Sequence, residues 1–344
     1  MKSSAFCTTA PIGMGHGGGA SSYWELEALK VTTEVKQVID MKSLDDEYAD
    51  NVFMQDYATA LTVDGSVDVV MTNGGTWSAT VRALNPSRLI ADSPAHKLAL
   101  SIEEWERMGR KYPYRHMSDP KLWVLYSQYL READVVITQA KQSVDYLKEL
   151  GICPKSFEVV PGGCILPNQI KPFSNIFKVG YIGAIGSDKG LAYLVKAWIG
   201  LMYKNAVCVL AGEYTPKLKP QLEPFTRVKF EVIGKVEDIS VVYNDIHVYV
   251  QPSVTEGFGL PVLEAMAYGR PVIVTEGAGV HELIDDGVEG YVVPIRDPVA
   301  IADRIRWFYD NPMRLEEMGK AARNKAEQYP WQRAFNEYKR IIDK

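Results

Sequence analysis

Short apolar runs alternate with amphipathic stretches along the first half of the chain. The apolar runs predict strands at 4–9, 34–40, 67–73, 88–94, within 131–139, and at 156–163. Stretches with helical periodicity, such as 20–30 and 141–151, separate these strands. A regular alternation of strands and helices is typical of a parallel sheet that is covered by helices on both faces. We therefore predict an α/β, doubly wound first domain.

A polar segment, 166–175, interrupts this pattern with two prolines and no periodicity. Such a segment is typical of an interdomain linker. After it the alternation restarts, and strands are predicted at 177–183, 206–212, 228–234, 246–253, 271–275 and 290–294. The pattern thus predicts two Rossmann-like domains, 1–167 and 168–329, facing across a cleft. In such folds ligands bind in the cleft, at the carboxyl ends of the strands.

The composition is that of a folded protein, since 47% of the 344 residues are hydrophobic and 24% are charged. The net charge of −5 at pH 7 argues against a nucleic-acid-binding protein that is held by a broad basic surface. It leaves room for a local basic site that binds a phosphorylated ligand.

Cysteine and histidine spacing indicates no metal site. None of the four cysteines forms a CxxC pair, and the five histidines show no spacing such as HExxH. We expect no transmembrane helix, because no apolar run reaches about 18 residues. The first residues also lack the apolar core of a signal peptide. We therefore expect a cytoplasmic protein with reduced thiols.

The stretch TEGFGLPVLEAMAYGRPVIVT, 255–275, carries the clearest candidate chemistry. Glu256 follows a predicted strand, and Glu264 lies about one turn inside a helix that we expect to begin near Pro261. Gly257 and Gly259 let backbone N–H groups approach a ligand closely, and the amides at a helix start favour an anion. A carboxylate accepts two hydrogen bonds from a diol such as a ribose. These features predict a pocket for a nucleotide-diphosphate compound.

The nonapeptide from Glu256 to Glu264 resembles the E-x7-E signature of retaining GT-B glycosyltransferases, in particular family GT4, also called glycosyl transferases group 1. Three longer blocks, 131–163, 179–198 and 269–298, resemble neighbouring parts of the same family. The resemblance covers residues 130–310 well and the N-terminal domain loosely. It implies a GT-B fold in which the C-terminal domain binds a nucleotide sugar. A terminal helix, 330–344, would pack back on the N-terminal, acceptor-side domain.

The resemblance also implies roles for single residues. Lys189 would bind the donor diphosphate as a cation, and Glu256 would contact the donor sugar near the reacting carbon. His96 would face the sugar as a third catalytic residue, and Glu264 would hold the ribose hydroxyls. The other donor-binding residues that it implies contribute mostly backbone, and they are Gly15, His16, Gly17, Gly234, Lys235, Val236, Gly257, Phe258, Gly259 and Leu260.

One position departs from the family pattern. The family usually has an arginine after the first glycine of the donor-domain opening block, where this chain has Ala184. The change removes one cation that would bind the diphosphate. No Asp-x-Asp motif is present, so we predict a metal-independent transfer without a cofactor, in which Lys189 and helix-start amides stabilise the leaving diphosphate. By analogy with the family, the departing phosphate takes the acceptor proton and the sugar keeps its anomeric configuration.

The predicted activity is transfer of a hexose from a UDP- or GDP-linked sugar to an unknown acceptor hydroxyl, on a glycan or a lipid-linked molecule. A nucleotide-sugar epimerase of the same fold is one alternative, and a silent sugar-nucleotide binder is another. An NAD-dependent oxidoreductase is a third, because Gly13, Gly15 and Gly18 with Glu34 fit a dinucleotide fingerprint. Basic and aromatic residues in 101–117 fit either a peripheral membrane contact or an ordinary solvated helix.

Overall fold

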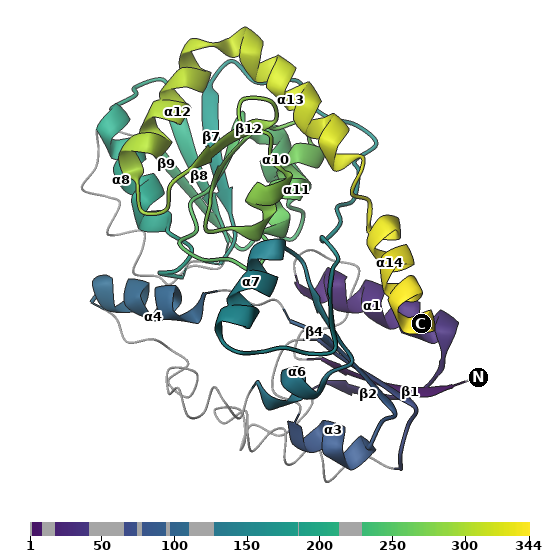
Figure 1. Cartoon of the computed structure of the whole chain (residues 1–344). Coiled ribbons are helices and arrows are strands. Elements are labelled where there is room, and N and C mark those ends of the chain that lie inside the picture. Colours follow the sequence, from purple (N-terminus) through teal and green to yellow (C-terminus); the bar gives the residue numbers. More distant parts are fainter. Residues whose placement is uncertain are drawn as a thin grey trace. The chain divides into compact units, whose positions relative to one another are not determined.

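A computed structural model describes residues 2–8, 18–40, 65–73, 78–93, 97–109, 127–184, 186–212 and 229–344. The chain divides into two compact units (Figure 1). The first unit consists of residues 1–96, 113–162 and 331–344, and the second consists of residues 97–112 and 163–330.

The first unit contains a parallel sheet whose described strands follow the order β2-β1-β3-β4-β5-β6. These strands are β1 (Ser3–Thr8), β2 (Glu34–Asp40), β3 (Val69–Asn73), β4 (Arg88–Asp92), β5 (Val135–Thr138) and β6 (Ser156–Val159). Its described helices are α1 (Gly18–Thr32), α3 (Ser78–Leu84), α6 (Gln128–Glu132), α7 (Lys141–Glu149) and α14 (Trp331–Asp343). Helices α1 and α14 lie on one side of the sheet, and α3 and α6 lie on the other (Figure 1).

The terminal helix α14 is part of the first unit, where it packs against α1. The guanidinium of Arg88, at the start of β4, donates hydrogen bonds to the carbonyls of Ile341 and Ile342, each at 2.7 Å. These bonds satisfy two of the carbonyls that a helix end leaves without a partner. The apolar face of α14, which includes Tyr338 and Ile341, is buried.

The second unit repeats the architecture, with a parallel sheet whose described strands follow the order β12-β11-β10-β7-β8-β9. These strands are β7 (Phe177–Ile182), β8 (Ala206–Ala211), β9 (Lys229–Gly234), β10 (Val248–Gln251), β11 (Val272–Thr275) and β12 (Gly290–Val293). The described helices are α4 (Leu98–Arg107), α8 (Leu191–Leu201), α10 (Ser240–Asp245), α11 (Leu260–Ala267), the 3₁₀ helix η4 (Gly279–Leu283), α12 (Pro298–Asp310) and α13 (Pro312–Ala326).

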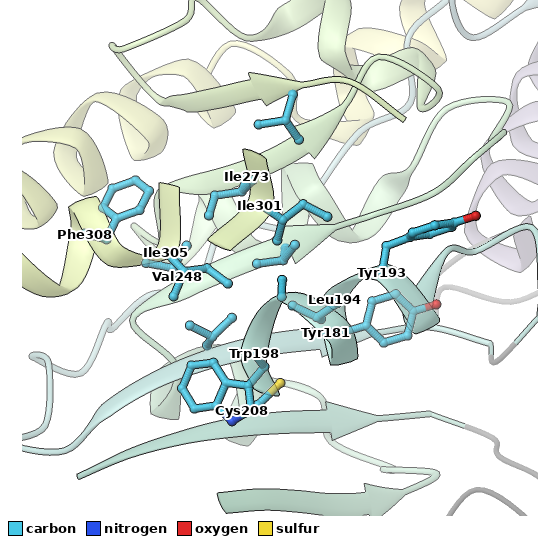
Figure 2. Packing of buried hydrophobic residues seen from close by; sticks show 14 of the residues in the cluster. Tyr181, Tyr193, Leu194, Trp198, Cys208, Val248, Ile273, Ile301, Ile305 and Phe308 are labelled. Atoms are coloured by element: carbon cyan, nitrogen blue, oxygen red, sulfur yellow. The ribbon is translucent and has the colours of Figure 1, made fainter. Parts of the chain in front are cut away.

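The hydrophobic core of the second unit lies between its sheet and helices α8 and α12. Figure 2 shows Trp198 of α8 and Phe308 of α12 with Val248 and Ile273 of the central strands, and all four are buried. The central strands β10 and β11 are buried along their whole length, which explains why the first three residues of each are apolar. Burial on both faces makes this sheet a firm support for the loops that follow its strands.

Helix α4 groups with the second unit, although the sequence analysis included it in a first domain of residues 1–167. The reason is a buried carboxylate. Glu104 accepts hydrogen bonds from the Tyr193 hydroxyl at 2.7 Å and from Nε of Arg296 at 2.8 Å. Both donors belong to the second unit, and sequence periodicity does not reveal such distant partners. The part of 101–117 that follows Gly109 lies outside the described residues.

The segment 166–175, predicted to be a linker, also lies within the second unit, and the boundary between the units follows Gly162. The segment has neither helix nor strand. It is held by Arg270, whose Nη2 donates to the Lys171 carbonyl at 2.9 Å and whose guanidinium lies over the Phe173 ring at 4.5 Å.

Candidate functional site

The candidate site lies in the second unit, where the loop between β10 and α11 carries Glu256. Backbone bonds fix this loop against the segment after β11. The Glu256 N–H donates to the Gly277 carbonyl at 2.9 Å, and the Val280 N–H donates to the Phe258 carbonyl at 2.8 Å. A side chain on Gly277 would not fit, since its Cβ would lie 2.4 Å from the Val254 carbonyl oxygen. The loop is therefore a preformed part of the unit.

Helix α11 begins directly after this loop. Gly259 is its N-terminal cap residue and has φ +108°, a conformation that favours glycine. Pro261 stands in the first turn, as expected from the sequence, and Phe258 and Leu260 are buried. The glycines thus set the sharp turn that brings the start of α11 next to Glu256.

Lys189 and Glu256 form an ion pair, although 67 residues separate them in the sequence. About a quarter of each side chain is exposed, 25% for Lys189 and 23% for Glu256, so a ligand can reach both. Burial alone would lower the pKa of the Lys189 amine, but the charge of Glu256 and its hydrogen bond raise that pKa above its ordinary value. Lys189 is therefore a cation at neutral pH.

The position of Lys189 depends on the glycine that follows it. Gly190 caps α8 with φ +67°, and a Cβ there would lie 1.9 Å from the Pro252 carbonyl oxygen. The N–H of Val254 also donates to the Asp188 carbonyl at 2.8 Å. Only glycine allows this close approach, which brings the loop after β7 against the loop after β10 and thereby Lys189 against Glu256.

Glu264 lies one turn inside α11 and is only 7% exposed. Its Oε2 accepts a hydrogen bond from the Tyr243 hydroxyl at 2.7 Å, and Tyr243 belongs to α10. A buried carboxylate needs such partners, because removing a charge from water without them is costly. Glu264 is therefore held in one orientation by a neighbouring helix.

Three glycines meet where β7, β8 and β9 end. The N–H of Gly212 donates to the Gly234 carbonyl at 2.7 Å, and a Cβ on Gly212 would lie 1.9 Å from the Gly183 carbonyl oxygen. Lys235, after Gly234, is exposed and Val236 is half-buried. The ends of these strands therefore approach one another closely through glycine backbone, and recognition of a base at 234–236 stays a prediction. Ala184, which follows Gly183, also contributes its backbone at these strand ends, because its carbonyl accepts a hydrogen bond from the Tyr181 hydroxyl at 2.7 Å.

Some predicted site residues are not tested by the structure. Gly15, His16, Gly17 and His96 lie outside the described residues. Lys189, Glu256 and Glu264 belong to one unit, and the structure pairs the first two.

Sequence reasoning missed the residues that support this site. The sequence analysis assigned no role to Tyr243 or Arg270. Lys97 was also missed, and its N–H donates to the Thr255 hydroxyl at 2.9 Å, one residue before Glu256. Tyr243 follows two valines in a short helix, which is a pattern that could have indicated its burial. No pattern in the sequence indicates that its hydroxyl contacts Glu264.

Among the described residues, no group of three or more histidine, cysteine, aspartate or glutamate side chains is arranged to hold a metal ion. No helix among them has the length and apolar character needed to cross a membrane.

Comparison with known families identifies the part of the chain that carries the site. The family model described as glycosyl transferases group 1 matches residues 166–325. This stretch belongs to the glycosyl transferases group 1 family. It includes Lys189, Glu256 and Glu264, and the predicted resemblance to this family is confirmed.

A curated relative is an uncharacterized glycosyltransferase from Haemophilus influenzae, which is 29% identical over 189 residues. The match covers 51% of this chain and 53% of that protein, so the chain spans about half the length of this relative. The comparison therefore concerns the glycosyltransferase region and leaves the rest of both chains unmatched.

Two solved structures share the fold of the whole chain. Sucrose-phosphate synthase from Thermosynechococcus elongatus has a TM-score of 0.75 at 19% identity, and the match covers 99% of this chain and 98% of that one. Alr3699/HepE of Anabaena, solved with UDP and glucose, has a TM-score of 0.70 at 16% identity, with 99% of each chain covered. The predicted α/β fold, GT-B with two Rossmann-like units, is confirmed.

Proposed function

We propose that this protein is a retaining glycosyltransferase that moves a hexose from a nucleotide-diphosphate sugar to an acceptor hydroxyl, without a metal ion. The observation that carries the proposal is the pairing of Lys189 with Glu256 beside the start of α11, which bears the buried Glu264. All three residues lie in the stretch that belongs to the group 1 family. A cation, a carboxylate near it and a second, buried carboxylate are the groups that a nucleotide-diphosphate sugar needs.

The diphosphate of the donor would replace Glu256 as the partner of Lys189. The two side chains neutralise each other in the structure, so Lys189 is held without an uncompensated buried charge. A diphosphate carries more negative charge than one carboxylate and competes well for the same amine. Backbone N–H groups at the start of α11 would add donors that favour the anion.

Glu264 would bind the ribose and Glu256 would bind the sugar. Glu256 lies in the loop before α11, and Glu264 lies about one turn inside that helix, eight positions further along the chain. The two carboxylates therefore suit opposite ends of one extended donor. The base would lie along the backbone of 234–236, where few side chains discriminate between bases. HepE was solved with UDP, so UDP is the first nucleotide to test.

The chemical step would proceed on one face of the sugar. The bond between the anomeric carbon and the diphosphate oxygen breaks, and the electron pair stays on the phosphate. A bond forms between the same carbon and the acceptor oxygen, whose proton passes to the departing phosphate oxygen. Lys189 stabilises the charge that develops on the phosphate, which is where electrostatic catalysis has its largest effect.

The family match favours this proposal over the alternatives. The dinucleotide fingerprint of an NAD-dependent oxidoreductase would use residues 13–34 and would leave the pair of Lys189 and Glu256 unexplained. An epimerase or a silent binder would use the same donor pocket, so only a measurement of transfer separates them from the proposed enzyme.

The test is to follow donor turnover by NMR with UDP-glucose and GDP-mannose, in buffer that contains EDTA. Water serves as the acceptor while the natural acceptor is unknown. We expect slow release of nucleoside diphosphate, with the α-anomer of the sugar formed first from an α-linked donor. Lys189→Ala should abolish this release.

Lys325→Ala provides the matched control, since Lys325 is 19% exposed and pairs with Asp285 at 2.8 Å and Glu289 at 3.2 Å. This variant should keep the wild-type rate. Release of the β-anomer first would contradict retention, and turnover that needs a divalent metal would contradict the metal-independent mechanism.

A further inference from the structure

Tyr243 is a buried residue to which the proposed function assigns no role. It lies on α10 and is fully buried, and its hydroxyl is 2.7 Å from Oε2 of Glu264 and 3.3 Å from the Pro261 carbonyl oxygen. Both partners belong to the first turn and a half of α11. The hydroxyl therefore contacts the helix that carries the proposed ribose ligand, and it contacts that ligand directly.

We propose that Tyr243 is a positioning residue that orients the Glu264 carboxylate for recognition of the two ribose hydroxyls. The inference rests on the proposed function of Glu264. A carboxylate binds both hydroxyls of a diol only when its plane is aligned with them, and rotation about its last side-chain bond is otherwise broad. A hydrogen bond to one oxygen, Oε2, sets that plane.

The orientation of Tyr243 is itself fixed from two sides. Arg270, which is 1% exposed, donates from Nε to the Tyr243 carbonyl at 2.8 Å and from Nη2 to the Asn244 carbonyl at 3.3 Å. The Tyr243 ring stacks on Tyr268, with ring centroids 5.2 Å apart. Arg270 thus holds the backbone at the end of α10, and Tyr268 holds the ring, so the hydroxyl has one position.

The electrostatics agree with a permanent donor. Burial, followed by the nearby charge of Glu264, raises the pKa of Tyr243 well above its ordinary value. The phenol therefore keeps its proton at every pH at which the protein would work. Because the acceptor is a carboxylate, the bond is of the charge-assisted kind, which is stronger than a bond between neutral groups.

The chain offers a matched control in Tyr249, on β10. It is also fully buried, and its hydroxyl donates to the Gln251 side chain at 2.6 Å and to the Ile182 carbonyl at 3.1 Å. Its hydroxyl has no hydrogen bond to Glu264 among the contacts of the described residues. The Tyr249 ring packs against Tyr243, with ring centroids 6.2 Å apart, and Tyr249→Phe keeps that ring while it removes a hydroxyl that is not hydrogen-bonded to the proposed ribose ligand.

The experiment is calorimetric titration of the full chain with UDP and with 2′,3′-dideoxy-UDP. For Tyr243→Phe we expect UDP binding to weaken about tenfold and dideoxy-UDP binding to change less than twofold. Tyr249→Phe should leave both affinities near the wild-type values. On a Glu264→Gln background, Tyr243→Phe should have no further effect on UDP, since the two residues act through one contact.

A second variant covers the case in which Tyr243→Phe folds poorly. Tyr268→Leu removes the ring that stacks on Tyr243, and Tyr268 is itself only half-buried. We expect it to weaken UDP binding about threefold, again with little effect on dideoxy-UDP.

The outcomes separate this inference from the proposed function. If Glu264→Gln weakens UDP binding and Tyr243→Phe does not, the role of Tyr243 is refuted while the site stands. If Tyr243→Phe weakens UDP and dideoxy-UDP equally, Tyr243 only supports the fold, and the inference is wrong. If the wild-type chain binds none of UDP, GDP and ADP, the proposed function and the inference fail together.

Discussion

Glu256→Gln should change donor binding and transfer in opposite directions. Glu256 pairs with Lys189 in the structure, so under the proposed function a diphosphate must displace Glu256 from the amine. Both side chains are about a quarter exposed, 25% and 23%, so solvent screens the pair and its worth is about 1 kcal/mol. Removing the competing carboxylate should therefore tighten UDP binding by up to about fivefold. Transfer should slow at least about a hundredfold, since the variant loses the carboxylate that contacts the sugar.

The same substitution makes a prediction about pH. Glu256 raises the pKa of Lys189 against the opposing effect of burial. Without Glu256, burial dominates, so the pKa of Lys189 should fall. UDP affinity of the variant should then decline at a lower pH than the affinity of the wild-type protein, as the amine loses its proton. Titrations between pH 7 and pH 10 measure this difference.

The assay is calorimetry for UDP affinity, combined with NMR for donor turnover. Glu289→Gln is the control, because Glu289 is 3% exposed and pairs with Lys325 at 3.2 Å. It should alter neither quantity. UDP binding that is tenfold weaker in Glu256→Gln would refute the reasoning, since Glu256 would then support the diphosphate site through Lys189 and not compete for it. An unchanged turnover rate would refute its role at the sugar.

Three further predictions concern stability. Gly190→Ala should destabilise the second unit by at least about 2 kcal/mol and weaken UDP binding, because φ is +67° and the Cβ would meet the Pro252 carbonyl oxygen. Urea unfolding measures the loss of stability, and a variant as stable as the wild-type protein would contradict the close approach. Glu104→Gln should cost about 2 kcal/mol, since the Arg296 guanidinium then keeps only Glu103, at 3.0 Å, as a carboxylate partner, and an unchanged midpoint would argue against the anchoring of α4. Burial, followed by the charge of Glu25, raises the pKa of Asp92 well above its ordinary value. The folded state then holds a proton that the unfolded state loses near pH 4, so the free energy of unfolding should fall as pH rises from that value. Asp92→Asn should reduce the slope of the free energy of unfolding against pH, and a slope equal to that of the wild-type protein would contradict this.

Much of the fold is predictable from local patterns. The buried central strands each begin with three apolar residues, and the prediction of a strand at 271–275 agrees with β11 at Val272–Thr275. The start of α11 is encoded by its neighbours in the sequence, Gly259 and Pro261, which act within one turn. Such features depend on residues that are close in the sequence.

The supporting contacts of the site depend on residues that are far apart. Glu104 lies 89 positions from Tyr193 and 192 positions from Arg296, and no local pattern connects them. Tyr243 and Glu264 lie on two different helices, 21 positions apart. Roles for Lys189, Glu256 and Glu264 came from the family resemblance, whereas the ion pair between the first two became visible only in the structure.

The most direct test of the account is calorimetric titration of the purified chain with UDP, GDP, ADP and NAD in the presence of EDTA. The account predicts that one nucleoside diphosphate binds and NAD does not. It also predicts that Lys189→Ala and Glu264→Ala each weaken this binding at least about tenfold, as expected for the loss of a hydrogen bond to a charged group. Binding of NAD alone, or equal nucleotide affinity in the wild-type protein and both variants, would contradict the proposed donor site.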